Sequence, residues 1–216
     1  VFLTETREYL YYDNERIAQY SFTDVGGLTD LGINFGRSAQ LRAGYLYASR
    51  KANVDTGPRV LPEVEAVDAG ITAQFVYDTR DAAFAPTRGL AATVEYMYTD
   101  DSLGADRDWQ RLEAGARFAL PLRGDVIWLA AAGGSNLGSD LPPDRFFTLG
   151  GPGSFPGLEL AQYRAPEYWT VSGSYLWKFA DIQTLRGESM YIGAQIQGGA
   201  IANWLKGLQI GPDGPD

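Results

Sequence analysis

The sequence predicts an all-β protein, an antiparallel β-barrel whose strands cross a membrane. Three features predict this fold: segments in which apolar and polar residues alternate, turns of few residues that alternate with longer loops, and many glycine and aromatic residues. The 216 residues include 26 Gly, 13 Tyr and 5 Trp. Such enrichment is typical of closely packed strands with aromatic girdles at both membrane interfaces.

Residues 68–99 contain the clearest pair of strands. Successive strand side chains point to opposite faces, so an alternating segment has one apolar and one polar face. Each arm has about 9 to 11 residues, enough for a tilted strand to cross the hydrocarbon layer. We therefore expect Val94 to face lipid and Glu95 to face the lumen. The apolar faces comprise Ala69, Ile71, Ala73, Phe75 and Tyr77, then Leu90, Ala92, Val94, Tyr96 and Tyr98.

The same alternation recurs along the chain. A change of parity at Gly26 and Gly27 predicts a bulge or bend. The uncharged run at residues 189–205 is interpreted as a strand rather than a membrane helix, because its apolar residues alternate and three glycines interrupt it. We expect a polar loop at residues 50–67 and an acidic loop at residues 100–108. The remaining alternating segments are residues 6–12, 16–22, 31–35, 41–47, 112–118, 126–132 and 169–179.

These segments amount to roughly nine strands in one barrel domain, residues 1–216. An unpaired strand edge in lipid leaves backbone donors and acceptors unsatisfied, and such barrels close with an even number of strands. We therefore expect the chain to form part of a barrel of about 16 strands, with the first and last strands outside it.

The composition excludes several classes of protein. A formal net charge of −9 argues against nucleic-acid binding, which needs a basic surface. The chain has no His, so it lacks a His-assisted nucleophile or a His-ligated metal, and no serine lies in a G-x-S-x-G motif. We predict no enzyme in this segment, no catalytic residue, no cofactor and no metal site. The acidic loop is interpreted as solvated, with divalent-cation binding as the alternative; its carboxylates are Asp100, Asp101, Asp106 and Asp108.

The turn between the two arms of the first pair reads YDTRD at residues 77–81 and FAPTRG at residues 84–89. Pro86 and Gly89 alone would indicate an ordinary turn. Asp78, Arg80 and Asp81 at this spacing predict charge-assisted hydrogen bonds that fix the turn at the periplasmic rim. The whole segment resembles the D-[ST]-R-[DN]-x2-F-x-P-[ST]-x-G hairpin of the bacterial surface-antigen superfamily.

A Gly/Pro-rich stretch at residues 133–166 contains FTLGGPGSFPGL at residues 147–158. It is similar to the superfamily's lumen loop, in which a Gly-Gly pair precedes a V-R-G-[FY] tip. Here Pro156 replaces the arginine, as in barrels fused to patatin-like phospholipases, the type V-d autotransporters. We expect an inward-folded loop held mainly by apolar contacts of Phe155 and Leu158. The motif residues of this loop are Gly150, Gly151, Phe155, Pro156, Gly157 and Leu158.

The resemblance implies a bacterial outer-membrane barrel associated with POTRA domains. Its first implied function is a translocator or anchor that holds or secretes a passenger domain, for which a patatin-like lipase is the expected passenger. The alternative is an assembly factor like those of the BAM and TAM systems, or a two-partner-secretion transporter. Implied partners are outer-membrane lipid, lipopolysaccharide, the barrel assembly machinery and a passenger or POTRA domain of the same polypeptide; a homodimer stays open.

Overall fold

A computed structural model describes residues 1–12, 15–58, 63–151, 154–182 and 188–202. Within these residues one antiparallel sheet has the strand order β1-β2-β3-β4-β5-β6-β7-β10-β11. This arrangement confirms the predicted all-β antiparallel fold. The strands are β1 (Phe2–Tyr12), β2 (Glu15–Phe35), β3 (Ala39–Thr56), β4 (Val64–Asp78), β5 (Gly89–Thr99), β6 (Trp109–Leu122), β7 (Asp125–Ser135), β10 (Glu167–Ile182) and β11 (Glu188–Ala202).

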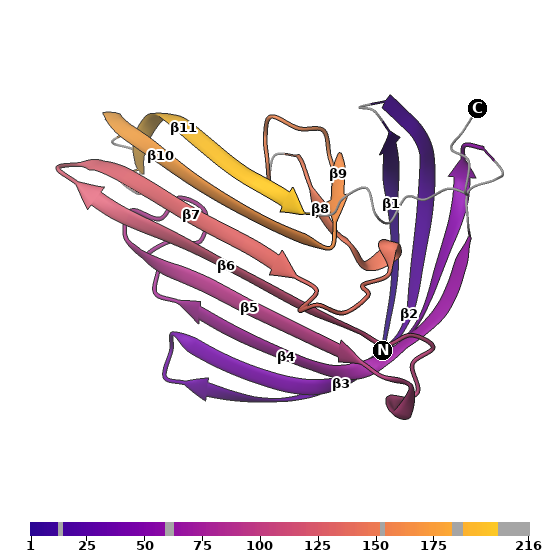
Figure 1. The fold of residues 1–216 in the computed structure, drawn as a ribbon. Helices are drawn as coiled ribbons and strands as arrows, with labels where there is room; N and C mark the ends of the chain where they lie inside the picture. Colours follow the sequence, from indigo (N-terminus) through magenta and orange to yellow (C-terminus); the bar gives the residue numbers. More distant parts are fainter. Residues whose placement is uncertain (13–14, 59–62, 152–153, 183–187, 203–216) are drawn as a thin grey trace.

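The sheet curves into a trough with a convex and a concave face (Figure 1). A small hairpin of β8 (Phe147–Leu149) and β9 (Tyr163–Ala165) lies on the concave side, between the two ends of the sheet. Two single-turn helices complete the described structure, η1 (Asp101–Leu103) and η2 (Pro143–Arg145). Within the described residues, no helix is long and apolar enough to cross a membrane.

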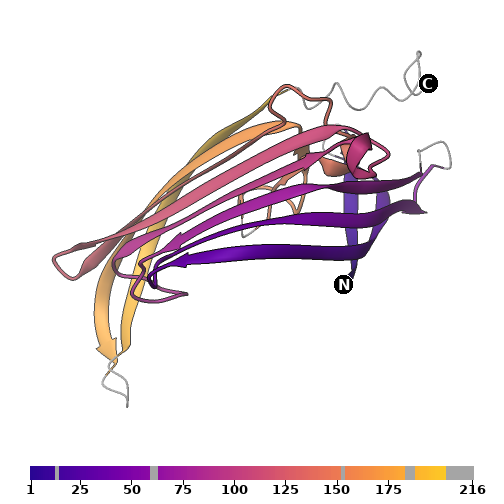
Figure 2. The same ribbon diagram turned by 90° about the horizontal axis from the view of Figure 1, so that it is seen from below.

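The strand ends form two rims (Figure 2). At the turn rim, β2 connects to β3, β4 to β5 and β6 to β7. At the loop rim, β3 connects to β4, β5 to β6 and β7 to β10. The last connection, residues 136–166, is called the long loop below. Two connections at the turn rim are short, residues 36–38 and 123–124, whereas the β4–β5 connection there spans residues 79–88. The long loop lies at the loop rim, and outer-membrane barrels likewise have short periplasmic turns and longer loops at the opposite rim.

Side-chain alternation separates the two faces as the sequence predicts. The convex face is mainly apolar from β4 to β11, whereas the concave face carries Gln74, Glu95, Glu113 and Arg117. Gln74 donates a hydrogen bond to Glu95 across β4 and β5, at 2.8 Å. Convex side chains that remain exposed include Leu31, Ile33, Phe35, Leu41, Tyr45, Ile71, Phe75, Val94, Phe118, Leu129, Trp169, Val171, Tyr175, Trp177, Met190 and Ile192.

No bulge occurs at Gly26 and Gly27, so this part of the prediction is wrong. The pairing of β2 with β3 continues through both residues without a register shift. The switch of the apolar residues from even to odd positions has another cause. Phe22 faces the concave side, where it is 3% exposed, whereas Leu31 and Ile33 face outward. One regular strand therefore has two environments, and its apolar residues change face where the environment changes.

The prediction for residues 50–67 needs correction. The expected loop at residues 50–67 is mostly strand, because β3 continues to Thr56 and β4 begins at Val64. Lys51 and Glu65 form a 3.0 Å ion pair there, which shows how polar residues support an extended hairpin. In β7 the apolar set of residues 126–132 faces the concave side, where Trp128 lines a hollow described below. Residues 13–14 and 203–216 lie outside the described residues.

Candidate functional site

The long loop crosses the concave face and contacts strands at both ends of the sheet. Its described parts touch β4 through Arg145, β1 through Arg164 and β11 through Ser154. These contacts come from three separate points along the loop. The concave surface under the loop is therefore the candidate functional site.

Asp68 in β4 is the centre of the first attachment. Its side chain is 0% exposed and accepts a 2.8 Å hydrogen bond from Arg145 Nε, a second bond from Arg145 Nη2 and a 3.1 Å bond from Trp109 Nε1. A buried carboxylate is tolerated only when it is paired and hydrogen-bonded. Arg145 therefore joins the start of the long loop to the barrel wall.

Asp144 extends this attachment to a neighbouring loop. It accepts bonds of 2.7 and 3.1 Å from Arg107, in the connection between β5 and β6, and lies 3.6 Å from Arg50 Nε. Burial opposes ionisation, but the hydrogen bonds and charge of Arg107 outweigh it, so the pKa of Asp144 is lowered below its ordinary value of 3.8. We call the following group the charge cluster: Asp24, Arg50, Asp68, Arg107, Asp144 and Arg145.

An apolar cluster lies beside the charge cluster. Trp109, Leu141 and Phe147 are buried together, and the Phe147 ring lies 5.2 Å from the Tyr168 ring. The Arg111 guanidinium stacks 4.2 Å above the Phe147 ring. Phe147 is 1% exposed, so burial of its ring helps to hold the long loop on the concave face.

The far end of the hairpin provides a second ionic attachment. Arg164 in β9 pairs with Glu8 in β1, and its guanidinium lies 5.4 Å from the centre of the Phe22 ring. Burial lowers the pKa of Arg164 to about 10, so the side chain stays charged at neutral pH. The apolar residues of β2 that face the concave side, such as Phe22, are therefore covered by the long loop rather than by lipid.

The predicted motif residues of the loop lie at its tip. Gly150 and Gly151 adopt φ of +126° and +90°, and a Cβ on Gly150 would meet Glu159 O at 1.9 Å. The Gly-Gly pair is therefore needed for backbone conformation and close approach. Phe155 and Leu158 are only partly buried, while Pro156 and Gly157 are exposed.

Hydrogen bonds also hold the tip. Leu158 N–H donates to Phe155 O at 3.0 Å, so the tip folds on itself, and Gln197 in β11 donates to Ser154 O at 2.6 Å. The expectation that the loop is held mainly by apolar contacts does not hold for the loop as a whole, because two ion pairs also attach it. Its anchors are Arg145 and Arg164, outside the tip. The only sequence signal for them was charge in segments otherwise interpreted as loop.

The predicted motif residues of the β4–β5 turn are brought together. Asp78 accepts bonds of 3.0 and 2.7 Å from Arg80 Nε and Nη2, and Asp81 accepts bonds from Thr87 N–H and Oγ1–H. The Thr87 hydroxyl lowers the pKa of Asp81. Gly89 has φ of +108°. The charge-assisted hydrogen bonds that the spacing of these residues predicts are therefore present in the turn.

This turn also contacts the concave face. Trp128 Nε1 in β7 donates a 2.8 Å hydrogen bond to Pro86 O, which holds the turn over the end of the trough. The ring of Phe84 is fully exposed beside it. No local sequence pattern indicates this contact, because it joins positions 42 residues apart.

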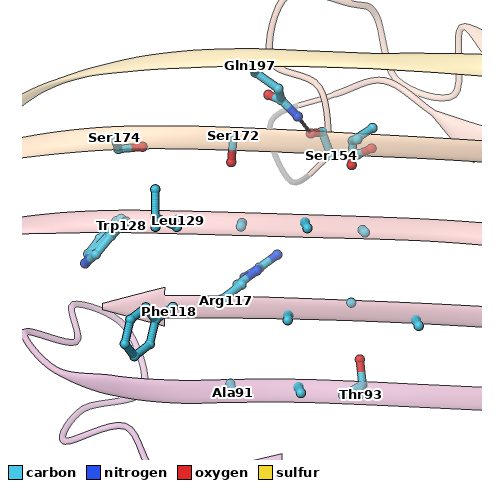
Figure 3. A pocket seen from close by; sticks show the side chains of 18 of the residues that line it. Ala91, Thr93, Arg117, Phe118, Trp128, Leu129, Ser154, Ser172, Ser174 and Gln197 are labelled. Carbon is cyan, nitrogen blue, oxygen red and sulfur yellow. Dashed lines mark hydrogen bonds between the residues drawn. The ribbon is translucent and has the colours of Figure 1, made fainter. Parts of the chain in front are cut away.

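A hollow of about 880 Å³ lies between this turn, the strands β5, β6, β7, β10 and β11, and the tip of the long loop (Figure 3). Small residues form much of its floor, because Thr93, Gly115 and Ala132 pair in register across three strands. Arg117 extends from β6 toward β7, and Gln197 reaches Ser154 from β11. Its polar lining residues are Arg80, Thr93, Glu95, Glu113, Arg117, Thr148, Ser154, Tyr168, Thr170, Ser172, Ser174, Gln195 and Gln197.

The acidic loop has a structural role in the described residues. Asp100 caps η1 through the Ser102 N–H, and Asp108 accepts the Asp101 N–H at 2.8 Å. Carboxylate oxygens of Asp100, Asp101 and Asp108 lie within 4.8 Å of one another. Asp106 lies apart from them and accepts a 2.7 Å bond from Val67 N–H. These bonds account for the loop's conformation.

The family model of the Omp85 superfamily domain matches residues 1–192. The chain belongs to the Omp85 superfamily. This membership confirms the resemblance at the level of the superfamily and places the protein in the bacterial outer membrane. The apolar convex face is therefore the lipid-facing surface. Barrels of this superfamily are transporters or assembly factors rather than enzymes.

The Omp85 fold is also found by structural comparison. The chain is similar to the crystal structure of BamA from Haemophilus ducreyi lacking POTRA domains 1–3, with a TM-score of 0.71 and 14% identity over 85% of this chain. At this identity the likeness concerns the fold alone. The chain spans 42% of the length of that structure. No curated protein sequence matches the chain.

Proposed function

We propose that this chain is part of the barrel of an outer-membrane translocator that holds or secretes a passenger domain of the same polypeptide. The hollow carries this proposal. It opens between the turn rim and the tip of the long loop, and hydroxyl, amide and guanidinium groups line it. An extended polypeptide needs such donors and acceptors, because its backbone groups must be paired wherever water is excluded.

The long loop supports the same function. Ionic attachments at Arg145 and Arg164 hold it across the trough, and its tip borders the hollow. Pro156 stands at the tip where most of the superfamily has arginine, as in the barrels fused to patatin-like phospholipases. We therefore propose a patatin-like lipase as the passenger, and a barrel of about 16 strands that includes the nine described here.

A photo-crosslinking amino acid at Ser172 tests the proposal in cells that express the full-length protein. Ser172 lines the hollow, whereas its neighbour Val171 is 48% exposed on the lipid-facing side of the same strand. We expect the Ser172 position to capture the passenger segment and the Val171 position to capture none. Equal capture at both positions, or none at Ser172, would contradict a polypeptide path through the hollow.

The second candidate is an assembly factor that inserts other barrels. Its support is the fold shared with BamA. In that case crosslinks would join the protein to other outer-membrane barrel proteins, and would arise from strand edges rather than from the hollow. Several tandem POTRA domains in the full-length protein would favour this candidate, and a patatin domain would favour the translocator.

A further inference from the structure

A second depression lies on the opposite, lipid-facing side of the sheet. It is a shallow apolar groove of about 370 Å³ across β7, β10 and β11, bordered by the side chains of Ile127, Tyr175 and Ile196. Gly173 forms its floor between Leu129 and Ile196, with which it pairs in register. An added Cβ on Gly173 would lie 3.7 Å from Leu129 Cδ2 and 4.0 Å from Ile196 Cγ2, which is ordinary van der Waals contact, so a methyl group would fit between these two side chains without overlap.

The groove lies within the hydrocarbon band of the membrane. Trp169 and Trp177 project from the same face of β10, four residues to either side of Gly173, and both are about half exposed. Tryptophan is typical of the two membrane interfaces. Eight residues of strand span about 26 Å along the strand, so at a tilt of about 40° the two rings lie about 20 Å apart across the membrane, comparable with the height of the apolar band of a barrel.

We propose that this groove binds one acyl chain of an outer-membrane lipid. The groove is continuous with the lipid-facing surface, and its bordering side chains are apolar. Ser174 and Gln195 also border it, but both residues line the concave hollow as well, on the other side of the sheet. A polypeptide in the groove would find no partners for its backbone groups, whereas a hydrocarbon chain needs none.

The glycine itself supports an occupant. Glycine weakens a strand interior, and in strands it often marks a position where a ligand approaches closely. On the convex face of β10 the neighbouring positions Val171 and Tyr175 carry large side chains. Gly173 thus opens a gap in an otherwise continuous apolar surface, and a lipid chain restores that surface.

Native mass spectrometry of the full-length protein, purified in a delipidating detergent and then given phospholipid vesicles, tests the proposal. We expect the wild type to retain one lipid more tightly than the rest, and Gly173→Leu to lower this retention by about tenfold, because leucine occupies the space of the chain. Ala114→Leu adds the same side chain to the lipid-facing side of β6, outside the groove, and should retain lipid like the wild type.

A second variant separates occupancy from folding. Ala194→Leu fills the groove from β11 rather than β10. Heat-modifiable migration on gels reports whether each variant is folded. Loss of the tightly held lipid in either folded variant supports the proposal. Unchanged retention in both, or no tightly held lipid in the wild type, overturns it. A wild-type dimer that Gly173→Leu dissociates would assign the groove to a second copy and also overturn it.

Discussion

At the scale of single residues, the attachment of the long loop depends most on the pair of Arg145 and Asp68. Arg145→Met keeps the length of the side chain but leaves a fully buried carboxylate with fewer partners. We expect the unfolding free energy in detergent to fall by about 3 kcal/mol, since Trp109 and Arg107 still contact Asp68. Arg37→Met, at an exposed turn, is the control and should change it little. Equal effects of the two variants would contradict the central role of the pair.

The lowered pKa of Asp144 gives this residue a pH signature. A carboxyl group whose folded-state pKa lies below its ordinary value of 3.8 stabilises the folded state above that value. Its contribution is lost as the pH falls through the lowered pKa. We expect thermal stability to decline steeply below about pH 4, and Asp144→Asn to make that decline shallower. Thermal unfolding followed by circular dichroism across this pH range is the measurement. Identical pH profiles of the wild type and Asp144→Asn would show that Asp144 does not contribute to the loss of stability in acid.

Gly89 offers a test of the β4–β5 turn. Its φ of +108° is unfavourable for other residues, and a Cβ there would lie 2.5 Å from Thr79 O. Gly89→Val should therefore cost about 1 to 3 kcal/mol and reduce the folded fraction on heat-modifiable gels. Ala91→Val, two residues along the same strand, should be tolerated, because β-branched residues suit strands. Indistinguishable folded fractions would remove the case for a special turn.

At the scale of the strand, β5 tests the assignment of faces. Val94 is 38% exposed on the lipid-facing side, and Thr93 lines the hollow. Val94→Arg should destabilise the folded barrel by about 2 to 4 kcal/mol near the bilayer midplane, and Thr93→Arg by clearly less, because the charge of the latter reaches water. An unfolding titration in bilayers measures both. Similar losses would mean that the faces of β5 are assigned the wrong way round.

The strands and the β4–β5 turn were predictable from the sequence, whereas the attachments of the long loop were not. Alternation of apolar and polar residues predicts a strand from neighbouring positions alone. The residues of the turn are also close in sequence, so both signals are local. The bond between Arg145 and Asp24 joins residues 121 positions apart. A charge on the concave face of a strand, such as Asp68, has the same sequence pattern whether it meets water or a buried arginine.

At the scale of the whole molecule, the sheet has two different surfaces, and the long loop lies on one of them. The convex surface meets lipid, and Gly173 leaves a groove in it. The concave surface is partly covered by the long loop, which is held at Arg145, Arg164 and Ser154. The hollow lies where that cover ends. Transport through the barrel would therefore require the loop to remain seated beside the path or to move away from it.

The position of the long loop on the concave face is the central claim, and thiol crosslinking tests it most directly, since these 216 residues contain no Cys. Gln197 on the concave face bonds to Ser154 at the loop tip, whereas its neighbour Ile196 is 79% exposed on the lipid-facing side. With a short bis-maleimide in intact cells, we expect crosslinking of Ser154→Cys with Gln197→Cys and none with Ile196→Cys. Crosslinking of neither pair, or of both equally, would contradict a loop seated inside the barrel.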